Sequence, residues 1–169
     1  LNCFKILTTK LGVRIVKNRN GIYKVYGNGL NSFKTKNKLT KIFVGNSLTT
    51  CRLLCGLLAT YPNKFYLYGD ASANRRDMTR VIEPLEKIGA SFFPKGTTTM
   101  PLTIVGTNMP LAQNHVENHG SGQIKGMLLL NALSVSGETT IEERKISRSH
   151  TEKFLQKISA DIKIKKLKN

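Results

Sequence analysis

The stretch KIFVGNSLTTCRLLCGLLA (residues 41–59) contains the pattern on which the fold of this chain depends. Residues 41–44 are a short apolar run that ends at Gly45, which predicts a strand followed by a turn. Between residues 49 and 59 the leucines recur at helical spacing, which predicts a helix with one buried side. A strand that leads directly into such a helix indicates a fold in which helices pack against a sheet.

The segments on either side repeat this alternation of strands and helices. Upstream, alternating runs at residues 13–17 and 22–26 flank a glycine-containing turn and predict a β-hairpin. Downstream, the periodicity predicts strands at 65–68, 90–93, 102–105, 138–141 and 161–164, and helices at 77–88, 121–133 and 149–158. Strand pairs that alternate with single helices suggest an α+β fold of repeated βαβαββ units, with mixed sheets and buried helices, although no close sequence repeat accompanies them.

The composition is that of a globular protein with an unusual charge. Hydrophobic residues make up 40% of the 169, and 27 Lys and Arg outnumber 10 Asp and Glu, which gives a net charge of +17. No apolar run approaches the ~18 to 20 residues that cross a bilayer. The charge suits a nucleic-acid-binding protein, a lysine-rich surface, or an enzyme with small phosphorylated substrates. The basic residues are scattered and no RNP, KH or zinc-finger motif accompanies them, so these alternatives stay open at this point.

The cysteines indicate a reducing compartment, and we expect a cytoplasmic protein. Cys3, Cys51 and Cys55 are an odd number without the paired spacing of a disulfide framework. Cys51 and Cys55 are four residues apart on a predicted helix and share its apolar side. Because neither has a histidine or an acid beside it, we interpret both as buried structural thiols and not as a metal or redox pair.

Four junctions that lead into predicted helices carry polar residues, at 45–50, 69–78, 120–123 and 145–152. A helix N-terminus presents free backbone N–H groups and the positive end of the helix dipole, which suits an anion. Each junction taken alone also has a purely structural explanation. These are N-capping by Ser47 or Thr49, a solvated arginine pair next to Asp77, a capped helix start at 120–123, and a capping box of Ser149 and Glu152. Four of them in one chain favour an anion-binding protein.

The residues at these junctions resemble signature motifs of EPSP synthases, in the order of that family. The motifs are Gly45-Asn46-Ser47-x-Thr49-Thr50-x-Arg52, Gly69-Asp70 with Arg75-Arg76-x-Met78, Ser121-x-Gln123-x-Lys125, Gly137-Glu138-Thr139-Thr140 and Ser147-Arg148-x-His150-Thr151-Glu152. The resemblance spans most of residues 11–155. It implies a fold of two lobes, each of three βαβαββ units, with the substrates in the cleft. It also implies transfer of the enolpyruvyl group of phosphoenolpyruvate to shikimate 3-phosphate, with release of phosphate.

Within that fold the chain resembles an internal fragment that covers most of the N-terminal lobe. Residues 1–161 would form the lobe, incomplete at the N-terminus because the chain begins at Leu1, and residues 162–169 would be a basic tail. The implied partners are the second lobe of the same enzyme and the two small-molecule substrates, without a cofactor or a metal. The proton-transfer residues of the family lie outside the fragment. We therefore assign no catalytic residue within it and expect it to be inactive alone.

The resemblance also implies binding residues. Phosphoenolpyruvate would be held by Asn46, Leu48, Arg76 and Gln123, and shikimate 3-phosphate by Ser121, Gly122, Gln123, Ser147, Arg148 and His150. Two positions depart from the family pattern. Leu48 replaces a glycine that lies against phosphoenolpyruvate and is expected to crowd it, and Ser149 stands where an aspartate is common.

Three other interpretations remain. The related UDP-N-acetylglucosamine enolpyruvyl transferases use a cysteine on a flexible loop, a setting that neither Cys51 nor Cys55 has. A nucleic-acid-binding module would account for the net charge alone. A degenerate, non-catalytic remnant would account for Leu48 and for the missing parts of the enzyme.

Overall fold

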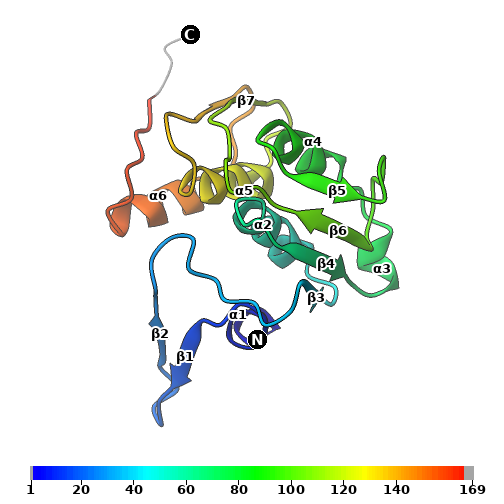
Figure 1. Cartoon of the computed structure of the whole chain (residues 1–169). Helices are drawn as coiled ribbons and strands as arrows, with labels where there is room; N and C mark the ends of the chain where they lie inside the picture. Colours follow the sequence, from blue (N-terminus) through cyan, green and yellow to red (C-terminus); the bar gives the residue numbers. More distant parts are fainter. Residues whose placement is uncertain (1, 166–169) are drawn as a thin grey trace.

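The computed structural model describes residues 2–165 and contains a four-stranded sheet with helices packed on one of its faces (Figure 1). The elements of this part are β3 (Leu39–Phe43), α2 (Leu48–Leu58), β4 (Lys64–Tyr68), α3 (Ala71–Asn74), α4 (Thr79–Lys87), β5 (Ser91–Phe93) and β6 (Leu102–Val105). The strands lie in the order β3-β4-β6-β5, with β3 and β4 parallel and β6 antiparallel to both neighbours. Apart from the short helix α3, this is one complete βαβαββ unit with a mixed sheet, as the sequence predicts.

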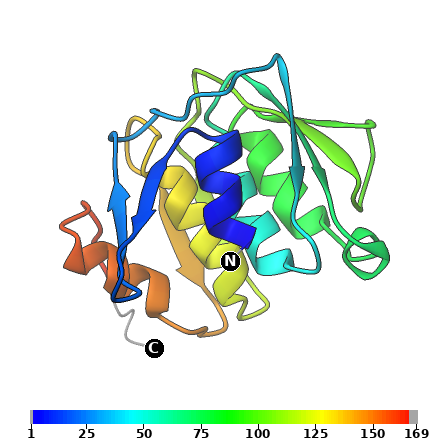
Figure 2. The same ribbon diagram turned by 90° about the horizontal axis from the view of Figure 1, so that it is seen from below.

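Incomplete units lie before and after the complete one. α1 (Asn2–Lys10) precedes the antiparallel pair β1 (Arg14–Lys17) and β2 (Tyr23–Tyr26), which confirms the predicted hairpin. After β6 come β7 (Asn114–Glu117), α5 (Gly122–Ala132), β8 (Thr140–Glu143) and α6 (His150–Lys157), in which α5 connects the parallel strands β7 and β8. The view from below again places the hairpin on the side of the molecule opposite the four-stranded sheet (Figure 2).

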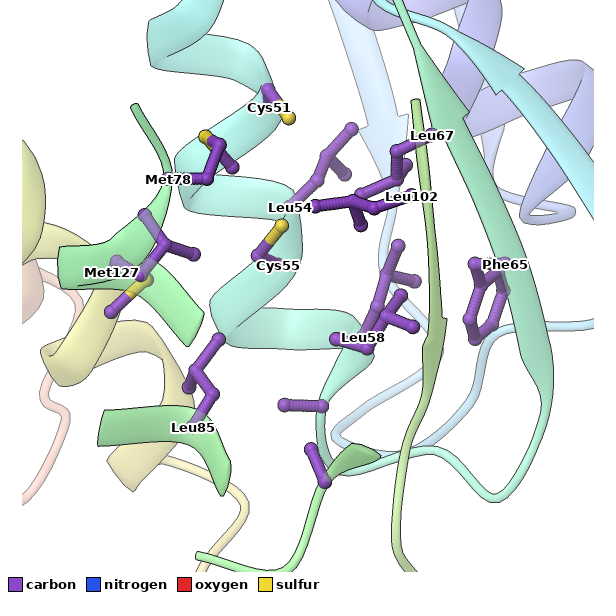
Figure 3. Packing of buried hydrophobic residues seen from close by; sticks show 14 of the residues in the cluster. Cys51, Leu54, Cys55, Leu58, Phe65, Leu67, Met78, Leu85, Leu102 and Met127 are labelled. Atoms are coloured by element: carbon purple, nitrogen blue, oxygen red, sulfur yellow. The ribbon is translucent and has the colours of Figure 1, made fainter. Parts of the chain in front are cut away.

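The core lies between the four-stranded sheet and the helices (Figure 3). Alternate residues of the strands point to this side, so Ile42 of β3, Leu67 of β4 and Leu102 of β6 are buried while their sequence neighbours are less so. The apolar side of α2 packs against them. Cys51 and Cys55 lie on that side with no exposed surface, which confirms that they are buried thiols.

Helices α2 and α5 pack against each other at a glycine. Gly56 of α2 is buried, and a Cβ atom at this position would stand 2.3 Å from the carbonyl oxygen of Met127 in α5. Asn131 Nδ2 donates a hydrogen bond to the Gly56 carbonyl oxygen at 3.0 Å. This close approach brings the N-terminal turns of the two helices together.

Three elements differ from the prediction. The sequence pattern does not reveal α1 or β7, and residues 161–165 do not form the predicted last strand. The buried residues of β7 are His115 and Glu117, so no apolar alternation marks it as a strand. The alternating pattern at 161–164 is not paired with another strand, and the predicted tail at 162–169 lies partly outside the described residues. Within residues 2–165 no helix is long and apolar enough to cross a membrane.

One predicted helix start and one proposed helix cap also differ from the structure. Asp77 lies outside α4, because its Oδ1 accepts a hydrogen bond from Thr79 Oγ1 at 2.6 Å and the helix begins only at Thr79. The capping box of Ser149 and Glu152 is absent, since the Ser149 side chain makes no cap hydrogen bond. Glu152 instead forms an ion pair with Lys125 of α5. The ion pair with Lys125, which is distant in sequence, therefore takes the place of the predicted capping box of Ser149 and Glu152.

His115 is expected to make the stability of the fold depend on pH. Burial, followed by the charge of Lys87, lowers the pKa of His115 below its ordinary value of about 6.5. Between these two values the unfolded chain binds a proton that the folded chain does not, so the free energy of unfolding should fall as pH drops below about 6.5. Urea denaturation at about pH 7.5 and about pH 5.5 should show a larger loss for the wild type than for His115→Gln. Equal losses in the two proteins would contradict this.

Candidate functional site

An open hollow lies where the N-terminus of α5 meets the loop after β8. Its volume is about 660 Å³, and it is lined by Arg52, Arg80, His119, Gly120, Ser121, Gly122, Gln123, Ile146, Ser147 and Arg148. Three of these residues are arginines and none is an aspartate or a glutamate, which suits an anion. A smaller hollow of about 180 Å³ beside α4 has Glu83 and Glu86 in its lining and does not share this property. The larger hollow also lies at the carboxyl ends of the parallel strands β7 and β8, where α/β sheets commonly bind ligands.

The N-terminus of α5 supplies hydrogen-bond donors to this hollow. Ser121 Oγ accepts a hydrogen bond from Ile124 N at 3.3 Å as the N-cap, which leaves the hydroxyl proton free for a ligand. The backbone N–H of Ser121 is already used, because it donates to Glu117 Oε2 at 3.0 Å. A Cβ atom at Gly122 would lie 3.6 Å from the carbonyl oxygen of Arg148, so the loop after β8 runs directly beside the start of the helix.

Gln123 connects the N-terminal turns of α5 and α2. Its Oε1 accepts a hydrogen bond from Arg52 Nη1 at 2.8 Å, and its Nε2 donates to Thr49 Oγ1 at 2.9 Å. One N–H of the side-chain amide remains for a ligand. These contacts orient Gln123 and bring the positive dipole ends of two helices to one edge of the hollow.

Arg52 is a lining residue to which the sequence assigns no binding role, although it falls within one of the family motifs. Its Nη2 donates to the Asp77 carbonyl oxygen at 3.3 Å, and its Nε is buried without a hydrogen-bond partner among the described residues. Burial, followed by the charge of Arg80, lowers the pKa of the Arg52 guanidinium. An anion in the hollow would therefore add to the negative charge of Asp77 and further offset the burial of Arg52. The available signal in the sequence is that Arg52 interrupts the apolar pattern of α2 one turn after its start.

The loop after β8 brings Ser147 and Arg148 to the hollow. Ser147 N donates to Glu143 Oε1 at 3.1 Å, and Ser147 Oγ donates to the same oxygen at 2.6 Å. The single hydroxyl proton of Ser147 is therefore used within the protein. Arg148 is exposed and lines the hollow.

The structure gathers most of the residues predicted for shikimate 3-phosphate and few of those predicted for phosphoenolpyruvate. The predicted residues that line the hollow are Ser121, Gly122, Gln123, Ser147 and Arg148. Those that do not line it are Asn46, Leu48, Arg76 and His150. Leu48 is half-buried and packs against the core, whereas the other three are exposed.

The loops that carry Asn46 and Arg76 lie side by side at the ends of the parallel strands β3 and β4. Asp70 N donates to the Gly45 carbonyl oxygen at 3.1 Å. A Cβ atom at Gly69 would stand 2.6 Å from the same oxygen, so the two loops touch through their backbones. The loop of Asn46 therefore adjoins the start of the segment that leads through α3 to Arg76.

The chain is similar to EPSP synthases over nearly all of its length. The family model for EPSP synthase (3-phosphoshikimate 1-carboxyvinyltransferase) matches residues 2–169. The 3-phosphoshikimate 1-carboxyvinyltransferases of Paramagnetospirillum magneticum and Magnetococcus marinus are 34% and 39% identical over 154 residues, which cover 91% and 90% of this chain and 34% of each relative. EPSP synthase of Acinetobacter baumannii, a solved structure, has a TM-score of 0.86 and 30% identity, over 96% of this chain and 36% of that one.

The chain thus spans about a third of the length of the curated relatives that it matches. The match includes the stretch from β3 to α6 that builds the hollow. With its complete βαβαββ unit and its ordered motifs, the chain belongs to the EPSP synthase family.

Proposed function

We propose that this chain is the part of a 3-phosphoshikimate 1-carboxyvinyltransferase that binds shikimate 3-phosphate. Transfer of the enolpyruvyl group then requires the second lobe of the enzyme as partner. The observation that carries the proposal is the hollow in which Ser121, Gln123 and Arg148 meet and which no acidic residue lines. The relatives named for this reaction are about three times as long as the chain, which agrees with a missing lobe.

The donors around the hollow match the chemistry of a phosphate group. A phosphate monoester carries close to two negative charges at neutral pH and three strong acceptor oxygens. Arg148 can pair with two of these oxygens, and the free protons of Ser121 and Gln123 can each donate to one. Arg52 and Arg80 add positive charge at the same place. Shikimate 3-phosphate therefore suits the hollow better than a neutral ligand of the same size.

We extend the proposal to phosphoenolpyruvate with Asn46, Leu48, Arg76 and Gln123 as its site. The loops of Asn46 and Arg76 adjoin each other, and Arg52 connects this edge to Gln123 through its two hydrogen-bonded nitrogens. Gln123 would then contact both substrates. Holding two anions in a fixed orientation while arginines offset their repulsion is the contribution that this chain would make to the reaction.

The proposal also covers domain limits and compartment. Residues 1–161 would belong to the N-terminal lobe, with residues 162–169 as its basic continuation. The enzyme would work in the cytoplasm, where thiols such as those of Cys51 and Cys55 stay reduced.

Calorimetric titration with shikimate 3-phosphate tests the proposed site on the chain as it stands. We expect the wild type to bind, and Gln123→Ala and Arg148→Ala to lose about tenfold or more in affinity. Each substitution removes a hydrogen bond to a charged group, worth about 1.5–3 kcal/mol. Arg75→Ala is the matched control, because Arg75 is also an exposed arginine but does not line the hollow.

Absence of binding to the wild type, or an unchanged affinity in both variants, would show that the assigned site is wrong. The net charge of +17 calls for a parallel titration with duplex DNA over a series of salt concentrations. Contacts to a nucleic-acid backbone would make the affinity fall steeply with salt. Tight, salt-dependent binding to DNA without binding to shikimate 3-phosphate would favour a nucleic-acid-binding module instead.

A further inference from the structure

Two glutamates end the parallel strands beneath the hollow. Glu117 is the last residue of β7 and Glu143 is the last residue of β8, and the two are direct partners in the register of the pair. Glu117 is buried and Glu143 is half-buried. Two carboxylates are thus brought together at the strand ends from which the loops of the hollow begin.

Each of these carboxylates accepts two hydrogen bonds from the loop that follows it. Glu117 Oε1 accepts from His119 N at 3.1 Å, and its Oε2 accepts from Ser121 N at 3.0 Å. Glu143 Oε1 accepts from Ser147 N at 3.1 Å and from Ser147 Oγ at 2.6 Å. In both cases the side chain reaches the backbone N–H four residues further along the chain. Hydrogen bonds to a carboxylate are stronger than those between neutral groups, so both loops are fixed firmly at the same point.

Lys125 supplies the cation of this cluster. It lies one turn after Ser121 in α5 and is buried, and its Nζ contacts Glu143 Oε2 at 2.9 Å and Glu152 Oε1 of α6 at 2.5 Å. Burial lowers the pKa of Lys125, but the two carboxylates outweigh burial and leave that pKa above its ordinary value. Helix α5 is thereby tied to the loop after β8 and to α6.

The cluster is not explained by a gain in stability alone. One ammonium group faces the two carboxylates of Glu143 and Glu152, Glu117 lies beside Glu143, and Glu152 Oε2 is buried without a hydrogen-bond partner among the described residues. Taking charges out of water is costly, and buried ion pairs often contribute less than apolar residues of the same size. What the cluster does provide is a fixed geometry for the two loops that line the hollow.

We propose that Glu117 and Glu143 are positioning residues that hold the two loops so that Ser121, Gln123 and Arg148 converge on one phosphate group. The inference rests on the proposed function for the identity of that phosphate. Neither glutamate lines the hollow, so each acts through the backbone of its loop and not by touching the ligand. Lys125 offsets the charge of Glu143 and keeps it in place.

The test compares isosteric variants by amide hydrogen exchange and by calorimetry with shikimate 3-phosphate. Glu117→Gln can accept only one of its two loop hydrogen bonds, and Glu143→Gln would turn an N–H₂ group either toward Lys125 or toward Ser147. We expect exchange to become about tenfold faster or more in the first variant at whichever of the His119 and Ser121 amides loses its acceptor, and in the second variant at the Ser147 amide if the N–H₂ group turns toward it. Affinity for shikimate 3-phosphate should fall about fivefold or more in both, with an unchanged circular dichroism spectrum.

Glu142→Gln is the matched control, because Glu142 is the exposed neighbour of Glu143 on β8 and, within residues 2–165, pairs only with the exposed Arg144. It should change neither measurement. Glu143→Asp is the second variant, in case Glu143→Gln fails to fold. It retains the charge next to Lys125 but shortens the side chain, so it should speed exchange at Ser147 and weaken binding as well.

The outcomes separate the two proposals. Unchanged exchange at both His119 and Ser121 in Glu117→Gln together with unchanged exchange at Ser147 in Glu143→Asp, or faster exchange with unchanged affinity, would overturn the positioning role while shikimate 3-phosphate still binds. If the wild type does not bind shikimate 3-phosphate but amide exchange in the variants becomes faster as expected, the proposed function is wrong. The conclusion that Glu117 and Glu143 fix the two loops would then still be correct.

Discussion

Replacing Lys125 with methionine is expected to destabilise the fold by about 3–5 kcal/mol near neutral pH, the loss typical when one partner is removed from a buried ion pair. Methionine fills a similar volume, so the loss comes from charge and not from a cavity. Glu143 and Glu152 would be left without the cation that both of them contact. The Glu152 side chain already has one buried oxygen without a partner, so it has no alternative within the described structure.

The pH dependence of this loss distinguishes charge from packing. Burial raises the pKa of Glu143, but hydrogen bonds from Ser147 and Lys125 outweigh it and hold that pKa below its ordinary value. Glu143 therefore contributes stability above about pH 4.3, its ordinary pKa, and this contribution is lost as pH falls through the lowered value. The difference between wild type and Lys125→Met should be largest near neutral pH and should shrink in acid.

Urea denaturation at about pH 7 and at a series of pH values below about 4, which passes through the lowered pKa of Glu143, measures both effects. Lys153→Met is the control, because Lys153 is exposed on α6 beside Glu152, and it should change stability by no more than about 0.5 kcal/mol. The double variant Lys125→Met/Glu152→Gln should recover part of the loss, since it removes one of the two stranded charges. A loss below about 1 kcal/mol near neutral pH, or a loss that does not shrink across the acid series, would contradict the role of Lys125 as the shared cation.

Gly56→Ala is expected to destabilise the protein by about 2–3 kcal/mol, although alanine is the better helix former by about 1 kcal/mol. The new Cβ atom would stand 2.3 Å from the Met127 carbonyl oxygen and 2.9 Å from Met127 Cγ. The oxygen belongs to the backbone of α5 and cannot rotate away, so the two helices must separate. Separation would also strain the hydrogen bond from Asn131 to the Gly56 carbonyl oxygen.

Gly126→Ala in α5 is the matched control for this prediction. Its Cβ atom would meet Thr151 Oγ1 at 3.0 Å and Leu53 Cδ2 at 3.3 Å, which are the ends of side chains that can turn aside. Helix propensity should then offset most of the crowding, with a net change within about 1 kcal/mol. Urea denaturation of both variants decides the matter. An equal loss in the two would show that backbone contact at Gly56 does not limit how closely α2 and α5 pack.

The structure confirms those parts of the prediction that depend on short stretches of chain. The strand at 41–44, the helix that follows it and the capped helix starts all appear, with Ser47 and Ser121 as the caps, because periodicity and capping involve residues close in sequence. The sequence does not predict strand β7, because its buried residues, His115 and Glu117, are polar. Glu117 is tolerated inside because backbone N–H groups of the loop after it donate to both of its carboxylate oxygens.

Some residues of the candidate site could likewise be predicted from the sequence, and others could not. The ordered motifs predict Ser121, Gln123 and Arg148 as anion-binding residues, and the hollow contains all three. Arg52 has no such assignment, because a single arginine on an amphipathic helix looks like any exposed position. Only the tertiary structure shows that Arg52 lies at the hollow, where it donates a hydrogen bond to Gln123, 71 residues later in the chain.

What the sequence determined by itself is the order of strands and helices, the membership of a family through ordered motifs, and the attraction of helix starts for anions. What only the tertiary structure decided is which polar groups meet. Glu152 forms an ion pair with Lys125 and no capping box with Ser149. Glu117 and Glu143 lie side by side at neighbouring strand ends. The physical reason is that a buried charge needs a partner, and the fold, not the local sequence, brings that partner within reach.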